Sequence, residues 1–350
     1  MWCGTLGELT GFVYSLEAPL GLLSRPRSLP VTYSPSQFQR GLSFPKFLSQ
    51  FGTEEQCLQE MFASRWPKGF ICPECGGQEH CRLPRRGLYQ CNVCHTQTSV
   101  TAGTIFHGTH LPLTSWFLAM HLLTCGKHSV SAMELKRQLG VTYETAWRMK
   151  QKLLHVMLER ENGRVLSGRV EMDDAYMGGE RHDGTTGRGT TGKTPFLAAV
   201  QTTPDGDPDG RKVLYVKLTK VRNFKGRTVK TWAKRSLATA SHVLTDGMTG
   251  FRCLRTVVKH HDRKVMPGGW RSAKHPAFAW VNTILGNLKG SLLGVCRWVS
   301  VKHLPRYLAE FQWRFNRRFD LSTILQRLLR AAVLTPPLPE NLLVLAERSR

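Results

Sequence analysis

Two pairs of closely spaced cysteines constrain this chain more than any other feature of its sequence. Cys72 and Cys75 form one CxxC pair, Cys91 and Cys94 form a second, and fifteen residues lie between the pairs. This spacing is typical of a four-thiolate zinc site, because each tight turn directs two sulfurs at one cation. A redox role for each pair is the alternative, but two pairs so close together favour structural zinc. The sequence therefore predicts a zinc ribbon without an open coordination position.

The chain is strongly basic along its whole length. It carries 49 Lys and Arg against 25 Asp and Glu, which gives a formal net charge of +24 over 350 residues. Such a field attracts nucleic acid or an anionic membrane, but no apolar run reaches the roughly 18 residues that a membrane helix needs. We therefore expect double-stranded DNA as the partner and no membrane. Ten cysteines are too few for a disulfide scaffold, so we expect a cytoplasmic, nucleoid-associated protein.

The composition divides the chain into five expected segments. Scattered Pro, Ser and Gly predict a poorly ordered leader at 1–43, and a short amphipathic helix then leads into the zinc ribbon at 44–110. We expect a helix-turn-helix DNA-binding region at 111–160, a mixed α/β domain at 165–335 and a C-terminal tail at 336–350. The fold class expected is thus multidomain α/β.

Residues 131–152 have the pattern of a helix-turn-helix. Apolar residues recur at helical spacing, and Gly140 and Thr142 stand where one helix would end and the next would be capped. An ordinary helical hairpin is the alternative, and the neighbouring ribbon and basic charge favour DNA binding. The start of the second helix would face the major groove, with two lysines reaching phosphates. These predicted DNA-binding residues are Tyr143, Glu144, Thr145, Arg148, Lys150 and Lys152.

Short β-prone runs and helical patterns alternate after residue 165. Strands are expected at 170–179, 195–204, 212–221, 241–247 and near 255–261, with helices at 230–240, 277–293 and 302–332.

Three carboxylates lie in or at the end of these apolar strands. Asp173 and Asp174 are adjacent in the first strand, and Asp246 ends a later strand before a glycine. Buried strands seldom carry carboxylates without a function, although each Asp alone could be a turn residue. If the strands are adjacent, the carboxylates can hold Mg²⁺ or Mn²⁺. Because neighbouring strand residues face opposite sides, we expect only one of Asp173 and Asp174 to join Asp246, and the pattern does not choose between them.

The sequence resembles insertion-sequence transposases that combine an N-terminal zinc ribbon with a ribonuclease-H-like catalytic core. The resemblance covers about 45–325. It rests on CPEC with CNVC, TSVTAGTIFHGTHLPLTSWF, VEMDDAYMGG, LTDG, WVNTILGNLKGSLLG and KHLPRYLAEFQWRFNRRF.

This resemblance implies a catalytic set of two Asp and a third polar residue, with Lys seven positions after it. Asp173 corresponds to the first carboxylate and Asp246 to the second, which leaves Asp174 a supporting role. Asn282 and Lys289 match the variant with Asn as the third member. Seven residues are two helical turns, so both side chains would share a face, with Asn282 toward the metal and Lys289 toward DNA phosphate.

The resemblance further implies a bacterial mobile element whose DDE-type transposase binds the element ends, cleaves them with Mg²⁺ or Mn²⁺ and transfers the strands. Self-association on DNA is expected. Two alternatives stay open at this stage: a non-enzymatic DNA-binding regulator, and a nuclease or resolvase on the same fold.

Overall fold

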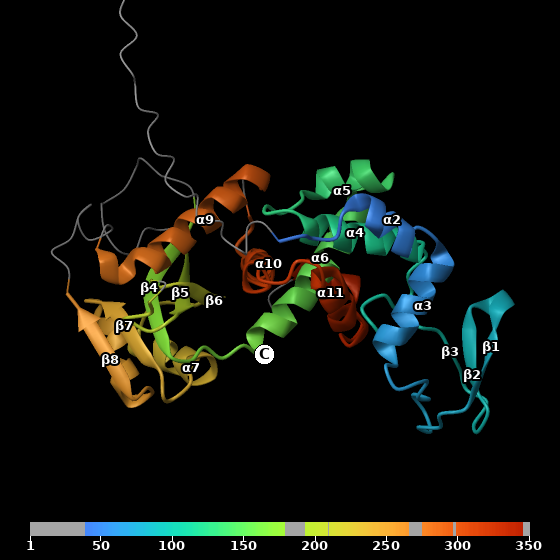
Figure 1. Ribbon diagram of the computed structural model, residues 1–350, viewed down its shortest axis with the longest axis horizontal. Helices are drawn as coiled ribbons and strands as arrows, with labels where there is room; N and C mark the ends of the chain where they lie inside the picture. The colour runs from blue at the N-terminus through green and yellow to red at the C-terminus, as the bar shows by residue number, and fades with distance from the viewer. Residues whose placement is uncertain (1–38, 179–192, 209, 266–274, 297–298, 346–350) are drawn as a thin grey trace, which may run out of the picture. The chain divides into compact units, whose positions relative to one another are not determined.

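The computed structural model describes residues 39–178, 193–208, 210–265, 275–296 and 299–345 (Figure 1). Most of the leader predicted at 1–43 lies outside these residues. Among the described residues, no helix has the length and apolar character that crossing a membrane requires.

The cysteine pairs lie in a small antiparallel sheet that follows two helices. Helices α2 (Phe44–Phe51) and α3 (Glu54–Arg65) precede strands β1 (His80–Leu83), β2 (Leu88–Cys91) and β3 (Gln97–Thr98), which pair in the order β1-β2-β3. Helix α3 begins with a capping box, in which the Thr53 hydroxyl accepts from the backbone N–H of Gln56 and the Gln56 side chain accepts from that of Thr53. The predicted leading helix is therefore present as two helices.

A cluster of helices follows the ribbon. Helices α4 (Leu113–Cys125), α5 (Ala132–Leu139) and α6 (Tyr143–Asn162) share one apolar core with α3 and with the distant α11 (Ile324–Val333). Gly140 ends α5 in the left-handed conformation at φ 65°, and the Thr142 hydroxyl caps α6 by accepting from the backbone N–H of Thr145. The turn between α5 and α6 therefore has the local structure that the sequence predicted.

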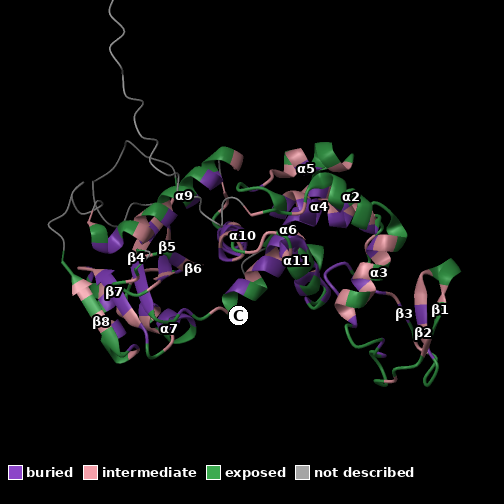
Figure 2. Cartoon of the chain, in the orientation of Figure 1, coloured by how far each residue is buried: buried purple, intermediate pink, exposed green. Residues whose placement is uncertain are grey.

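The remaining strands form a five-stranded sheet in the order β6-β5-β4-β7-β8. Strands β4 (Arg169–Met177), β5 (Thr194–Thr202) and β6 (Val213–Lys220) pair antiparallel, whereas β7 (His242–Asp246) and β8 (His260–Lys264) continue parallel to β4. Figure 2 shows β4 and β5 buried along most of their length. Because β4 is central and β7 lies beside it, their carboxyl ends are neighbours.

Helices cover both faces of this sheet (Figure 1). One apolar cluster joins Ala198 and Leu244 to α9 (Ala279–Val295) and α10 (Leu304–Asn316). The other joins Met172 and Val243 to α7 (Gly226–Ser236) and the 3-10 segment η2 (Thr249–Thr256). A short 3-10 turn η3 (Pro276–Phe278) leads into α9, and α12 (Glu340–Leu345) follows α11.

Helix α10 protects the outer edge of β6 with side-chain amides. Gln312 accepts from the backbone N–H of Leu218 at 2.9 Å and donates to its carbonyl at 3.0 Å. Asn316 makes the same pair of bonds to Val216, at 2.8 and 3.0 Å. An open strand edge can pair with another chain, so these two side chains occupy positions that another strand would take.

Two of the expected elements differ from the structure. The single helix expected over 302–332 is two helices, α10 and α11, because Asp320 accepts hydrogen bonds from the hydroxyls of Ser322 and Thr323 in the connection. Short polar side chains of this kind compete with helical backbone hydrogen bonds. The strand expected near 255–261 starts only at His260, after η2. Helix α11 lies within the predicted limits of the α/β domain, but its apolar side chains pack in the helical core.

Candidate metal centre and active site

The four predicted zinc ligands come together at the base of the ribbon. One sulfur from each of Cys72, Cys75, Cys91 and Cys94 lies within 4.8 Å of the others. The Cys72 and Cys94 sulfurs are 3.6 Å apart, as are those of Cys75 and Cys91. Cys81 is exposed and outside this group. Four converging thiols without carboxylates or imidazoles fit a tetrahedral Zn²⁺.

Backbone N–H groups support these sulfurs. Gly77 donates to the Cys75 sulfur and Val93 donates to the Cys91 sulfur, each at 3.4 Å. Hydrogen bonding to Thr96 lowers the pKa of the Cys94 thiol to about 6. The Gly77 N–H lowers the pKa of Cys75, but hydrogen bonds to the neighbouring thiols and burial raise it overall to about 12. The thiolate form that binds metal is therefore favoured at Cys94.

A second cluster of possible metal ligands lies at the carboxyl end of β7, beside the middle of β4. One oxygen from each of Asp173, Asp174 and Asp246 lies within 4.8 Å of the others, and all three residues are half-buried. The register explains this proximity, because β4 and β7 pair as far as Met172 with Thr245, and the carboxylates follow at the next positions. Divalent cations such as Mg²⁺ prefer oxygen ligands of this kind.

Strand alternation places Asp173 and Asp246 on the same face of the sheet. Ala175 and Leu244 belong to the apolar cluster under α9, and Asp173 and Asp246 are two positions from them. Successive side chains of a strand point to opposite faces, so both carboxylates lie on the face that α9 covers.

The expectation that only one of Asp173 and Asp174 lies near Asp246 is wrong. Both approach it, and the backbone N–H of Asp174 donates to the Asp173 carboxylate at 2.9 Å. Alternation separates side chains across the body of a sheet. Strand β4 continues to Met177 beside β5, but its pairing with β7 stops at Met172 and Thr245, so beyond that point no strand on the β7 side separates the two faces and both carboxylates can turn toward Asp246.

Helix α9 carries the predicted third member of the site. Asn282 lies in its first turn and is half-buried, and Lys289 lies seven residues later and is exposed. Their neighbours Val281, Ile284 and Leu288 pack into the core beneath α9. Asn282 therefore lies on the helix that covers the face bearing Asp173 and Asp246.

Glu171 is a buried acidic residue beside the candidate site that was not among the predicted site residues. It lies on β4, two positions before Asp173, and is 0% exposed. One of its carboxylate oxygens accepts from the backbone N–H groups of Trp280 and Val281, both at 3.1 Å. These groups belong to the first turn of α9, where helical N–H groups lack partners and a negative charge is favourable. Glu171 thereby joins the strand of Asp173 to the helix of Asn282.

Two arginines complete the environment of Glu171. Its other oxygen accepts from Arg169 at 2.9 Å and lies 3.4 Å from a guanidinium nitrogen of Arg211. Arg211 also donates to the carbonyl of Pro276, just before α9. These hydrogen bonds and ion pairs offset the cost of burying the carboxylate. The signal in the sequence was a third acidic residue in an apolar strand, at even spacing from Asp173.

The predicted DNA-binding residues divide by exposure. Tyr143, Glu144 and Arg148 are exposed at the start of α6, and Thr145 is half-buried. Arg148 forms an ion pair with Glu340 of α12 at 2.6 Å. The exposed residues lie on the surface of α6 that the helix-turn-helix prediction assigns to DNA.

The prediction that Lys150 reaches phosphate is wrong. Lys150 is only 1% exposed, and its ammonium donates to the Ser129 hydroxyl at 3.2 Å and the Val130 carbonyl at 2.6 Å. The reason is helical position, because Lys150 follows the buried Ala146 by four residues and faces the same core. Lys152 is half-buried and donates to the Ile105 carbonyl at 3.3 Å, and burial lowers its pKa.

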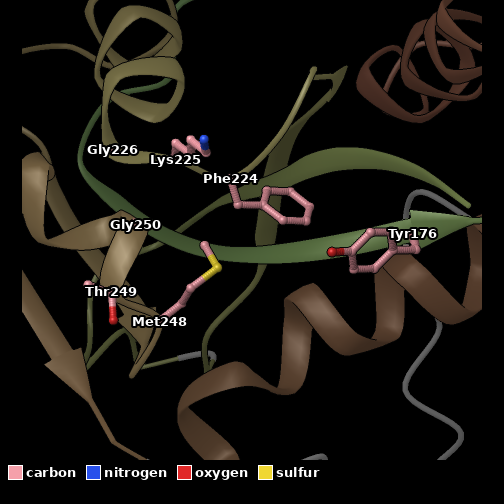
Figure 3. A pocket seen from close by; sticks show the side chains of 7 residues that line it. All are labelled: Tyr176, Phe224, Lys225, Gly226, Met248, Thr249 and Gly250. Carbon is pink, nitrogen blue, oxygen red and sulfur yellow. The ribbon is translucent and has the colours of Figure 1, made fainter. Parts of the chain in front are cut away.

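A pocket of about 480 Å³ opens beside the acidic cluster (Figure 3). Three segments line it: Tyr176 at the end of β4, Phe224 to Gly226 before and at the start of α7, and Met248 to Gly250 after β7. Figure 3 shows the side chains of Tyr176, Phe224 and Met248 around the same space.

Comparison with known protein families finds two matches in this chain. Residues 165–316 match the family model of the ISXO2-like transposase domain, and residues 52–97 match that of the transposase zinc-ribbon domain. A protein of Halobacterium salinarum, described as an uncharacterized protein in transposable element ISH50, is 27% identical over 151 residues. The match covers 41% of this chain and 50% of that protein, so the chain spans about half the length of this curated relative.

Solved structures with some similarity include two complexes of Mos1. The Mos1 strand transfer complex is 14% identical with a TM-score of 0.25, covering 61% of this chain and 75% of that one. A pre-cleavage Mos1 transpososome is 12% identical with a TM-score of 0.24, covering 59% and 74%. These scores are too low to define a fold. The two family matches lie in the expected order, and this chain therefore combines a segment similar to the transposase zinc-ribbon domain with one similar to the ISXO2-like transposase domain.

Proposed function

We propose that this chain is a DNA transposase that binds the ends of its insertion sequence, cleaves them and joins the freed strands to target DNA. The observation that carries the proposal is the convergence of Asp173, Asp174 and Asp246 where the pairing of two neighbouring parallel strands, β4 and β7, ends. The sheet order supports a ribonuclease-H-like domain, with three antiparallel strands followed by two parallel ones. We place this domain within the predicted limits 165–335.

The residues at the strand ends fit one or two divalent cations, Mg²⁺ or Mn²⁺. Asp173 and Asp246 would hold them from β4 and β7, and Asn282 would add a neutral oxygen from α9. When bound, such cations activate an attacking water or hydroxyl and stabilise the leaving oxygen. The four cysteines would hold a structural Zn²⁺, which would stabilise the ribbon.

The protein's own side chains orient the DNA for in-line attack at phosphorus. Exposed Lys289 would bind a phosphate beside the cleaved bond, seven residues along α9 from Asn282. Tyr143, Glu144, Thr145 and Arg148 at the start of α6 would contact the element end as a helix-turn-helix. Water attacks first and frees a 3′ hydroxyl, which then attacks the target strand. No covalent bond between protein and DNA is required.

The test is cleavage and joining of a DNA duplex that carries the element's terminal repeat, in Mg²⁺ and in Mn²⁺. The wild-type protein is expected to release a 3′ hydroxyl and to form strand-transfer products. Asp246→Ala is expected to lose both reactions while it binds the duplex with unchanged affinity. Cleavage without joined products would support a nuclease or resolvase, and equal activity of Asp246→Ala would contradict the proposed site.

The two adjacent carboxylates can be separated in the same assay. Asp173→Asn is expected to abolish cleavage because Asp173 shares a sheet face with Asp246. Asp174→Asn is expected to retain part of the activity, since Asp174 takes a supporting position beside Asp173. The opposite ranking would assign the first carboxylate to Asp174.

A further inference from the structure

The pocket beside the acidic cluster has no part in the mechanism described above. It is large enough for a nucleobase, at about 480 Å³, and it is lined by Tyr176, Phe224, Lys225, Gly226, Met248, Thr249 and Gly250. None of these residues is acidic, so the lining does not repel a nucleotide. The inference drawn from this pocket rests on the proposed function.

The pocket is joined directly to the acidic cluster at two points. The backbone N–H of Met248 donates to the Asp246 carboxylate at 3.0 Å, and the Met248 side chain lines the pocket. Tyr176 lies two positions after Asp174 on the same strand. A DNA phosphate held at the carboxylates would therefore have its own or the adjacent base within reach of the pocket.

The walls of the pocket suit a flat aromatic ligand. The rings of Tyr176 and Phe224 are 5.3 Å apart at their centroids and nearly perpendicular, at 87°. A base that stacks on one of these rings meets the other edge-on, and both arrangements are favourable for aromatic groups. The Met248 thioether adds a polarisable contact.

Glycines let the loops that line the pocket pack closely against each other. A side chain at Gly250 would meet the Phe224 carbonyl oxygen at 2.0 Å, so only glycine lets these two loops lie in contact. This contact holds Phe224 beside Met248. Lys225 supplies one exposed positive charge at the rim, where a phosphate next to the base could bind.

We propose that this pocket receives one unstacked nucleobase of the DNA end that the enzyme cleaves, with the base stacked on Phe224. Enzymes that do chemistry on a base hold it, once unstacked, between aromatic or apolar side chains, and the lining of this pocket offers the same kind of contact. Stacking on aromatic side chains accepts every base, because each base has a π-face. The pocket thus holds the strand beside the cleaved phosphate without reading its sequence.

The test pairs changes in the protein with changes in the DNA. Single abasic nucleotides are placed in turn at each position around the cleavage site of an otherwise normal end duplex. Phe224→Ala is expected to slow cleavage of the intact duplex on the order of 10-fold or more. At one abasic position, the wild-type protein is expected to cleave about as slowly as Phe224→Ala cleaves the intact duplex. Phe224→Ala is expected to cleave that abasic duplex no more slowly than the intact one, because the base that stacks on Phe224 is already absent.

Two further variants separate stacking from folding. Phe224→Trp keeps an aromatic face and is expected to cleave at close to the wild-type rate. Phe224→Leu keeps apolar volume without a π-face and is expected to be slow, at a melting temperature close to that of wild type. Phe319→Ala, which removes an exposed aromatic outside the pocket, serves as the matched control.

Three outcomes would overturn the inference. The first is wild-type cleavage by Phe224→Ala, and the second is equal loss in Phe224→Trp and Phe224→Ala. The third is a decrease in the cleavage rate by Phe224→Ala that is added in full to the decrease caused by the abasic nucleotide, wherever that nucleotide is placed. Each of these would leave the transposase proposal intact, provided that wild type cleaves and Asp246→Ala does not.

Discussion

Single buried ionisable side chains shape the stability of this chain at several positions. His303 is 8% exposed beside Arg306, with its Nδ1 at 3.4 Å from a guanidinium nitrogen. Burial first, and then the positive charges of Arg306 and Lys302, lower the pKa of His303 to about 4. The folded chain therefore holds this imidazole neutral at pH values where an unfolded chain would protonate it.

This lowered pKa predicts loss of stability in acid. Between about pH 6.5 and pH 4 the unfolded chain binds more protons at His303 than the folded chain, so the free energy of unfolding falls as pH falls through this window. The contribution of His303 is roughly 1–3 kcal/mol. Urea unfolding at several pH values should show that the free energy of unfolding of His303→Gln falls less with decreasing pH than that of wild type. His128 is exposed, so His128→Gln should show the same pH dependence as wild type. Equal pH dependence in all three proteins would contradict this account.

At the scale of elements, acidic side chains fix the starts of distant helices. Glu54 of α3 accepts from the backbone N–H of Leu113 at 2.8 Å at the start of α4. Glu171 of β4 does the same for α9. A carboxylate placed at a helix N-terminus satisfies unpaired N–H groups and interacts favourably with the helix dipole. Helix α9, whose start is fixed by Glu171, also carries Asn282.

Glu171→Gln tests whether this contact matters for the reaction. The amide offers only one oxygen, so either the first turn of α9 or the arginine pair loses its acceptor. We expect cleavage to slow by roughly 10–100-fold, the usual cost of losing a group that orients metal ligands. DNA binding through α6 should be unchanged in a filter-binding assay.

A double variant distinguishes this positioning role from general loss of stability. If Glu171 acts through Asn282, then Glu171→Gln should slow Asn282→Ala by much less than it slows wild type. Full additivity of the two losses in the rate of cleavage would show that Glu171 acts independently of Asn282.

The zinc ribbon is held together by its cysteines and by buried aromatic side chains such as Phe70 and Tyr89, which pack in the core of the neighbouring helices. Its strands have four, four and two residues, which is too little sheet to be stable alone. Cys94→Ser is expected to lose bound zinc and to open residues 72–98 to protease, with the five-stranded sheet retained. Zinc content and limited proteolysis measure both effects. Cys81→Ser, at an exposed cysteine outside the site, should keep its zinc, and loss there would point to a different ligand set.

At the scale of the whole described chain, Glu161 joins the helical region to the α/β domain. This carboxylate is 2% exposed at the end of α6, and it accepts from Arg317 at 2.6 Å and from Asn316 at 2.8 Å. Asn316 in turn bonds the edge of β6. Lys217 of β6 donates to the carbonyl of Asn162 at 3.0 Å, at the end of α6. Burial lowers the pKa of Lys217 to about 8.

Glu161→Gln is expected to destabilise the chain by roughly 3 kcal/mol, because it leaves buried Arg317 without its counter-charge. The free energy of unfolding from urea titration measures this loss. Glu159→Gln, at a position of α6 that is 53% exposed, is the control and should lie within about 0.5 kcal/mol of wild type. A Glu161 variant as stable as the Glu159 variant would show that the buried pair contributes no net stability.

Local patterns determined much of this protein before its three-dimensional structure was considered. The CxxC spacing predicted the four-sulfur cluster, Gly140 and Thr142 predicted the turn between α5 and α6, and apolar periodicity predicted most strands of the sheet. These features depend on residues that are close in sequence, so their physical causes are visible there. The family resemblance extended this to the transposase domain, which the family matches confirm.

Tertiary structure decided which distant groups meet. Asp174 approaches Asp246 because the pairing of β4 with β7 ends just before them, and Lys150 is buried because α6 packs with that face inward. Glu171 meets Val281, 110 residues away, because α9 starts over β4. Spacing along the chain carries no record of such contacts. They arise from the free energy of satisfying buried charges and N–H groups once the chain has folded.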